Sequence, residues 1–199
     1  MTEIPGTTLF AVDCVRLQDT AYALRRCLDA CRFERAMLLT DRDFALEGVE
    51  TVRIPTIGSI EEFCDFMAKR AVDYVETERV LHVHWDGFVV DPGAWDPRFL
   101  DYDYIGAVWP WLEEGKRVGN GGFSLRSRRL FEALRDPEIV DVRHEDVAIC
   151  QTYRPLLEGR YGIRFAPEEI ANLFSVEHGW SPRHFGFHGT FHLPRFRGF

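Results

Sequence analysis

The sequence has no run of about 18 uninterrupted apolar residues, the length that crosses a bilayer as a helix, so it predicts no membrane span. Its first residues, Met1 to Thr8, lack the basic and apolar regions of a signal peptide. The five cysteines are odd in number and show no CxxC spacing, which favours free buried thiols in a reducing compartment. We therefore expect a soluble, cytoplasmic protein.

Basic residues are also scarce, because 24 Lys and Arg stand against 32 Asp and Glu, for a formal net charge of −8. Proteins that bind nucleic acid gather Lys and Arg to neutralise phosphates, so nucleic acid is not expected as a partner. The charge still permits an anionic small ligand that is carried on a metal. A hydrophobic content of 46%, with 14% aromatic residues, supplies a core and excludes disorder.

No repeat, low-complexity tract or Pro/Gly/Ser-rich linker divides the 199 residues, so a single domain over 1–199 is expected. Apolar runs predict strands at Leu9–Val15, Ala36–Thr40, Val49–Ile54, Arg79–Trp85, Tyr104–Trp109 and Gly122–Arg126. Helical spacing predicts helices at Asp19–Cys31, from the Ser59 and Glu62 capping box to Tyr74, at Arg128–Arg135 and at Glu145–Arg154, with Pro155 kinking or ending the last. Strands separated by helices indicate an α/β fold, a mostly parallel sheet flanked by helices.

Acidic residues follow three of the predicted strands, where open α/β sheets bind their ligands. Asp13 and Asp86 come at strand ends, and Asp41 with Asp43 follows the strand at Ala36–Thr40. Chance placement in loops is an equal alternative for the last pair. The sequence thus predicts a ligand site at one edge of the sheet.

A second pattern, HVHWDG, places His82, His84 and Asp86 on one face of a strand and suggests a metal site. Metallo-β-lactamase-like hydrolases need a further His directly after the Asp, where this chain has Gly87. Non-haem iron oxygenases share the order of His84, Asp86, His188 and Arg197, but they are all-β proteins. Two core histidines and a turn aspartate are the structural alternative.

Two further segments carry candidate chemistry. Asn120, Gly121 and Gly122 permit positive φ and a close approach of the backbone to a ligand, although a hairpin turn would use the same residues. Glu145 and Asp146 open a helix, where the macrodipole stabilises acidic residues and where a general base would also sit.

Taken together, four segments resemble a glycosyltransferase-like family of the GT-A fold: HWDGFVVDPGAWDPRFLDYDYIGAVWP, VGNGGFSLRS, HEDV and FGFHG. The resemblance covers Val80 to Gly189. It implies that His84-Trp85-Asp86 replaces the DxD motif, that Gly119–Gly122 is the glycine-rich loop, and that His144-Glu145-Asp146 is the xED motif. His84 stands in place of the first Asp of DxD, which puts metal affinity in question.

The same resemblance implies roles for these residues. Asp86 and His188 would bind Mn²⁺ or Mg²⁺, Asp146 would be the base of an inverting transfer, and Glu145 would contact the sugar or the acceptor. The donor would be a nucleotide sugar, with a UDP-sugar favoured, and the acceptor is unknown. The donor-binding set is Asp13, Asp41, His84, Trp85, Asp86, Asn120, Gly121 and Gly122.

Residues 1–90 would form the nucleotide-binding half and residues 91–199 the acceptor and catalytic half. A homodimer could complete the acceptor site of so short a chain. The contrasting hypothesis is a non-catalytic module that binds nucleotide sugars or carbohydrate.

Overall fold

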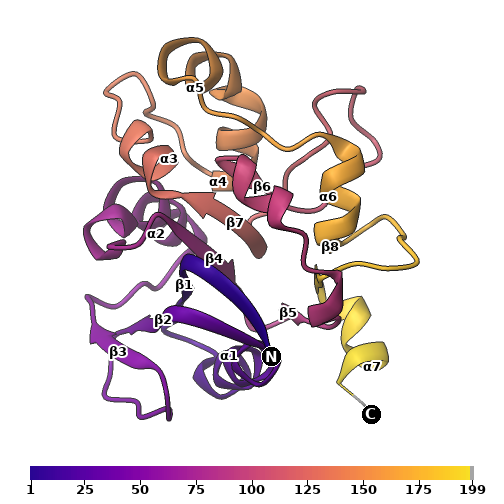
Figure 1. Cartoon of the computed structure of the whole chain (residues 1–199). Helices are drawn as coiled ribbons and strands as arrows, with labels where there is room; N and C mark the ends of the chain where they lie inside the picture. The colour runs from indigo at the N-terminus through magenta and orange to yellow at the C-terminus, as the bar shows by residue number, and fades with distance from the viewer. Residues whose placement is uncertain (198–199) are drawn as a thin grey trace.

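A six-stranded sheet with the order β3-β2-β1-β4-β7-β6 forms the centre of the computed structural model, which describes residues 1–197 (Figure 1). Its strands are β1 (Thr2–Val12), β2 (Cys31–Thr40), β3 (Glu50–Arg53), β4 (Arg79–Val83), β6 (Tyr104–Ile105) and β7 (Phe123–Ser127). Strands β3, β2, β1 and β4 run parallel, and β7 pairs antiparallel with both β4 and β6. The predicted fold class, a mostly parallel sheet flanked by helices, is confirmed.

Helices cover both faces of this sheet. They are α1 (Leu17–Ala30), α2 (Ile60–Asp65), α3 (Arg128–Ala133), α4 (Glu145–Val147), α5 (Arg154–Tyr161), α6 (Glu168–Phe174) and α7 (Leu193–Phe196). A π-helical turn, Phe66–Arg70, and a 3₁₀ turn, Ala71–Tyr74, continue α2, so the predicted helical segment up to Tyr74 is confirmed. Among the described residues, no helix combines the length and the apolarity needed to cross a bilayer.

Alternating side chains of β1 explain why both faces are covered. Leu9 and Ala11 pack in a cluster with Leu24 of α1, whereas Phe10 and Val12 pack in another with Met67 of the π-helical turn. Strands buried on both faces are typical of parallel sheets with crossover helices. The carboxyl ends of β1 and β4 therefore open between α1 and α2.

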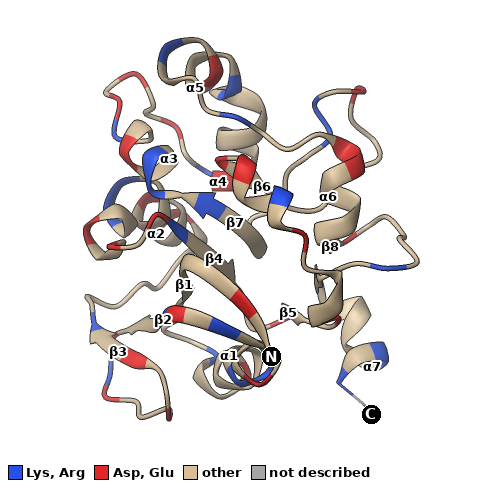
Figure 2. Cartoon of the chain, viewed as in Figure 1, with Lys and Arg blue, Asp and Glu red and all other residues tan. Residues whose placement is uncertain are grey.

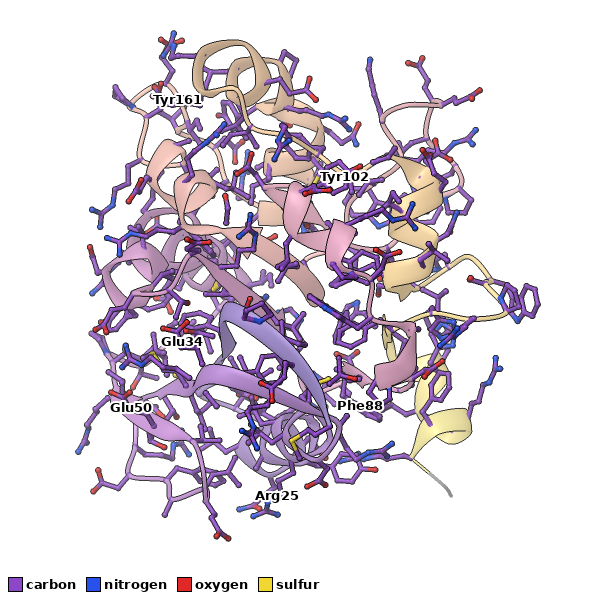
Figure 3. The ribbon with its side chains drawn as sticks, viewed as in Figure 1. Arg25, Glu34, Glu50, Phe88, Tyr102 and Tyr161 are labelled. Carbon is purple, nitrogen blue, oxygen red and sulfur yellow. The ribbon has the colours of Figure 1, made fainter. Side chains whose placement is uncertain are left out.

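A second, three-stranded sheet lies beside the first, and the sequence did not predict it. It consists of β5 (Gly87–Val89), β9 (Gly186–His188) and β8 (Ser175–Val176), with β9 in the centre. Phe88 of β5 is fully buried, with its ring 5.6 Å from that of Tyr22 on α1 and 4.7 Å from that of Phe187 on β9 (Figure 3). This small sheet brings residues 186–188 against the segment that follows β4.

Several predicted boundaries were wrong. β1 begins at Thr2 and passes through Gly6, whose φ of +60° accompanies a register shift, and it ends before Asp13. The strand predicted for Tyr104–Trp109 stops at Ile105, and the next residue, Gly106, lies so close to the loop that an added Cβ would be 1.9 Å from the Gly119 carbonyl oxygen.

The helix predicted for Glu145–Arg154 is interrupted. After α4 it continues as a π-helical turn, Ala148–Thr152, and α5 then starts afresh with Pro155 in its first turn. Proline suits that position because the amide hydrogen it lacks has no helical partner there. Within residues 1–197 all five cysteines are free and buried, as expected.

Candidate functional site

His84, Asp86 and His188 converge where the two sheets meet. His84 and Asp86 follow β4, and the pairing of Gly87 with His188 in the small sheet brings β9 alongside them. One ligand atom from each residue lies within 4.8 Å of the others, and His188 Nε2 is 3.2 Å from Asp86 Oδ1. The predicted pair, Asp86 and His188, is thus brought together, and His84 joins it. We call these three residues the His-Asp-His cluster.

The donor set and its burial fit a divalent cation. His84 Nε2 is buried and has no hydrogen-bond partner among the described residues, which is rare for a buried polar atom. Burial and the neighbouring His188 lower the pKa of His84 to about 3, so its imidazole is neutral, as a metal ligand must be. Two imidazoles and one carboxylate suit Mn²⁺ better than Mg²⁺, which prefers oxygen ligands.

His188 is held by a second carboxylate that the sequence did not reveal. Its Nδ1 lies 3.2 Å from Glu177 Oε1, and Glu177 also accepts a hydrogen bond of 3.1 Å from Trp109 Nε1. Burial disfavours the charged imidazole, but hydrogen bonds to Asp86 and Glu177 raise the pKa of His188 to about 9, so a cation bound here would displace the proton that Nε2 shares with Asp86. A carboxylate on the far ring nitrogen is the usual support of a metal-binding histidine.

His82, the first residue of the HVHWDG pattern, belongs to the core instead. It is fully buried, its Nδ1 lies 2.9 Å from the Gly121 carbonyl oxygen, and its ring centroid is 4.9 Å from that of His84. It therefore supports the glycine-rich loop rather than joining the cluster.

The glycine-rich loop forms the inner wall of the cluster. Asn120 has a φ of +66° and is 2% exposed, with its Nδ2 2.8 Å from His188 Nδ1. A Cβ atom on Gly122 would lie 2.1 Å from His188 Nε2. The sequence predicted an approach of this backbone to a ligand; in the structure His188 itself fills the space that the glycine leaves.

Substitution of Gly122 by alanine is therefore expected to displace His188 and to weaken Mn²⁺ binding by about 10–100-fold, the cost typical of a disturbed second contact of a metal ligand. Isothermal titration with Mn²⁺ measures the effect, and circular dichroism checks folding. Gly179→Ala is the matched control, because among residues 1–197 nothing lies within 4 Å of its added carbon. Equal affinity of the two variants would contradict the prediction.

The xED motif lies behind the same loop. Asp146 is half-buried, and its Oδ2 accepts a hydrogen bond of 3.1 Å from the Gly121 amide. Glu145 is 4% exposed and forms a buried ion pair of 2.7 Å with Arg126 of β7, where Figure 2 shows the acidic α4 beside basic β7. The expectation that Glu145 touches the sugar or the acceptor needs correction, because its carboxylate faces Arg126 rather than an open edge.

A cavity of about 380 Å³ opens at the carboxyl ends of β1 and β4. It is lined by the predicted donor residues Asp13, His84 and Trp85, together with Arg16, whose guanidinium lies 4.2 Å from the centre of the Trp85 ring. Asp13 accepts hydrogen bonds from the backbone amides of Val15 (2.6 Å) and Arg16 (2.8 Å), which fixes the turn before α1. The volume is in the range of small-molecule sites.

Asp41 is not among the described residues that line this cavity, although Arg42, which binds its carboxylate, also donates to the carbonyl oxygen of Cys14 in the lining (2.7 Å). Its carboxylate accepts hydrogen bonds from Arg42 (2.7 Å) and Thr56 (3.0 Å), and Asp43 is exposed near Arg53. These contacts lower the pKa of Asp41, chiefly through the hydrogen bond from Arg42. The structure therefore does not group Asp41 with the other predicted donor residues.

The oxygenase alternative was wrong in its fold. Its three ligands do meet, but in a mixed α/β fold rather than an all-β one. Arg197 pairs with Asp19 of α1 at 2.7 Å instead of facing the cluster.

Comparison with known proteins supports the fold. No curated protein matches the sequence. Among solved structures, the crystal structure of the apo-form glycosyltransferase GlyE of Streptococcus pneumoniae TIGR4 is similar, with a TM-score of 0.51 and 13% sequence identity. The match covers 92% of this chain and 54% of that chain, so the present chain spans about half the length of GlyE. At this identity the likeness shows a glycosyltransferase-like fold alone.

One family is matched over most of the chain. Its model, described as a protein of unknown function (DUF5672), covers residues 48–188, a span that includes the whole His-Asp-His cluster. The chain belongs to this family.

Proposed function

We propose that this protein is a metal-dependent glycosyltransferase that moves a sugar from a nucleotide-sugar donor to an acceptor hydroxyl. One observation carries the proposal: His84 belongs both to the His-Asp-His cluster and to the lining of the 380 Å³ cavity. A cation site and a small-molecule cavity that share a residue are what a diphosphate-linked donor requires.

The cavity supports the assignment of the donor to the first half of the chain, because its lining runs from Val12 to Trp85. The donor's base or ribose would lie between Trp85 and the turn at Asp13, beside the Arg16 guanidinium, which stacks on Trp85 and pairs with Asp19 at 3.6 Å. A UDP-sugar is the first donor to test, since uridine donors are the commonest in the fold that the motifs resemble.

His84, Asp86 and His188 would hold Mn²⁺ or Mg²⁺ next to the donor's diphosphate. Such a cation, when bound, neutralises the negative charge that grows on the leaving diphosphate. Glu177 accepts from Nδ1 and fixes the orientation of the His188 ring, and Gly122 leaves room for it. The net charge of −8 is then compatible with an anionic donor.

Asp146 would accept the proton of the attacking hydroxyl. Its Oδ2 is held by the Gly121 amide, which fixes the carboxylate beside the loop that carries Asn120 and Gly122. A single displacement assisted by this base inverts the anomeric centre.

Thermal unfolding with a panel of nucleotide sugars, each with and without Mn²⁺, tests the proposal. A true donor at about 100 times its Kd stabilises the fold by about 2.7 kcal/mol, which raises Tm by roughly 5–10 °C. The gain should require Mn²⁺ and disappear with EDTA. A panel in which no nucleotide sugar raises Tm would overturn the proposal.

Slow donor hydrolysis separates the two hypotheses that the sequence leaves open. A transferase with a bound donor releases the nucleoside diphosphate by transfer to water, whereas a binding module leaves the donor intact. The replacement of the first DxD aspartate by His84 makes the module a real competitor. Stabilisation by a donor without any hydrolysis would assign the protein to that class.

A further inference from the structure

Three exposed rings from separate segments of the chain form a row on the surface. Trp111 precedes β7 and is 61% exposed, His178 follows β8, and Phe191 lies after β9 and is 56% exposed. Ring centroids are 4.9 Å apart for Trp111 and His178 and 5.4 Å apart for His178 and Phe191. We call Trp111, His178 and Phe191 the aromatic row.

The aromatic row is continuous with the His-Asp-His cluster. Trp111 stacks on Trp109 with 6.3 Å between ring centroids, and Trp109 Nε1 donates to Glu177, the carboxylate that holds His188. At the other end of the row, the backbone that leads to Phe191 is fixed to Asp86, whose carbonyl oxygen accepts a 3.1 Å hydrogen bond from Gly189. The row is therefore linked to the cluster on one side through Trp109 and Glu177 and on the other through the Gly189 backbone.

The chemistry of the row fits a sugar ring better than other ligands. The faces of aromatic rings carry partial negative charge, which attracts the polarised C–H groups of a pyranose. His178 lies between the two apolar rings with its side chain 48% exposed, and it can exchange hydrogen bonds with hydroxyls. A pyranose offers a C–H face to the apolar rings and hydroxyls around its rim to the imidazole.

Charge and area argue against a second copy or a membrane. A second copy carries the same net charge of −8, and anionic lipid headgroups need basic clusters. A stable protein interface also buries about 800 Å² on each partner, far more than three rings separated by polar atoms supply.

We propose that Trp111, His178 and Phe191 bind a carbohydrate acceptor: the planes of Trp111 and His178 lie at 71°, so the sugar ring packs on an apolar ring while the imidazole contacts its hydroxyls. That the carbohydrate is an acceptor rests on the proposed function. The inference adds the substrate class: a glycan rather than a lipid, a peptide or an apolar metabolite.

An array of unmodified oligosaccharides, probed with the full chain in EDTA, tests the row without metal or donor. The wild-type protein and Val140→Ala, which shortens an exposed apolar residue between α3 and α4, are expected to bind the same glycans. Trp111→Ala is expected to bind at least 10-fold more weakly, and Trp111→Phe, which keeps an aromatic face, within a few-fold of wild type. Circular dichroism checks that each variant folds.

Two results would overturn the inference: wild-type protein that binds no glycan of the array, or Trp111→Ala that binds as tightly as Val140→Ala. Self-association in sedimentation that Trp111→Ala abolishes would assign the row to a second copy and also overturn it. Donor hydrolysis by wild-type protein is measured separately with Mn²⁺. The glycan array therefore tests the aromatic row, and donor hydrolysis tests the proposed function, so failure of one is distinguished from failure of the other.

Discussion

Replacement of Asp146 by asparagine is expected to slow sugar transfer by about 10²–10⁴-fold, the usual contribution of a positioned general base. Asparagine has nearly the same shape, and its amide oxygen can still accept the hydrogen bond from Gly121. It cannot take up a proton at neutral pH. The loss should therefore fall on kcat, with the Mn²⁺-dependent rise of Tm in the presence of donor unchanged.

Release of nucleoside diphosphate with acceptor present measures this effect. Asp141→Asn is the matched control, because Asp141 precedes α4 on the same segment but is exposed and paired with Arg143. Wild-type turnover by Asp146→Asn would remove this residue from the mechanism. Proton nuclear magnetic resonance of the first product then shows whether the anomeric configuration has been inverted.

Substitution of Arg126 by methionine is expected to lower the free energy of unfolding by about 3–5 kcal/mol, because it leaves the carboxylate of Glu145 buried without its partner. Arg126 is wholly buried, and it also donates to Ser124 Oγ (2.9 Å) and to the Gly121 carbonyl oxygen (3.2 Å). For a chain of this length the loss corresponds to a fall in Tm of roughly 6–20 °C.

The stability lost by Arg126→Met should grow as the pH rises. Burial raises the pKa of Glu145, and Arg126 opposes that rise. Without Arg126 the pKa rises further, so the folded protein holds a proton that the unfolded chain has already lost. Stability of the variant then falls as the pH increases above the unfolded pKa of about 4.3, and the deficit is larger at pH 8 than at pH 5.

Denaturant unfolding of a small set of variants measures the contribution of the Arg126–Glu145 ion pair to the free energy of unfolding. The double variant Arg126→Met with Glu145→Leu should recover much of the loss, since two apolar side chains leave no buried charge. Arg143→Met serves as control; its ion pair with Asp141 is exposed, and such pairs contribute about 0–1 kcal/mol. A single variant as stable as wild type, or a double variant no better than the single, would contradict the prediction.

Long periodic segments made most of the large sheet predictable. The apolar core of β1 and β2, the capping box at Ser59 and the helical spacing after Asp19 each carry a local signal, and each lies where expected. The strands β5, β8 and β9 have two or three residues, too few to show any period. They form only because packing around Phe88 and Phe187 holds them together.

Some residues of the candidate site were also predictable from the sequence, and others were not. Asp86 and His188 could be paired from motif order, since each lies in a distinctive segment. Glu177 and Arg126 could not, because their partners lie 11 and 19 residues away in sequence and no local pattern marks them. Asp41 lies outside the cavity lining for a local reason: its neighbour Arg42 binds the carboxylate.

The pairing of β5 with β9 has a consequence for how the candidate cation site is assembled. Three residue pairs, from Gly87 with His188 to Val89 with Gly186, hold the C-terminal segment against the end of β4. The ladder is short, but Phe88 and Phe187 within it are fully buried, so opening it would cost their packing and would take His188 away from Asp86. An ion bound by Asp86 and by His188 would connect the two segments. Its affinity would then report how firmly residues 186–188 are docked against β5.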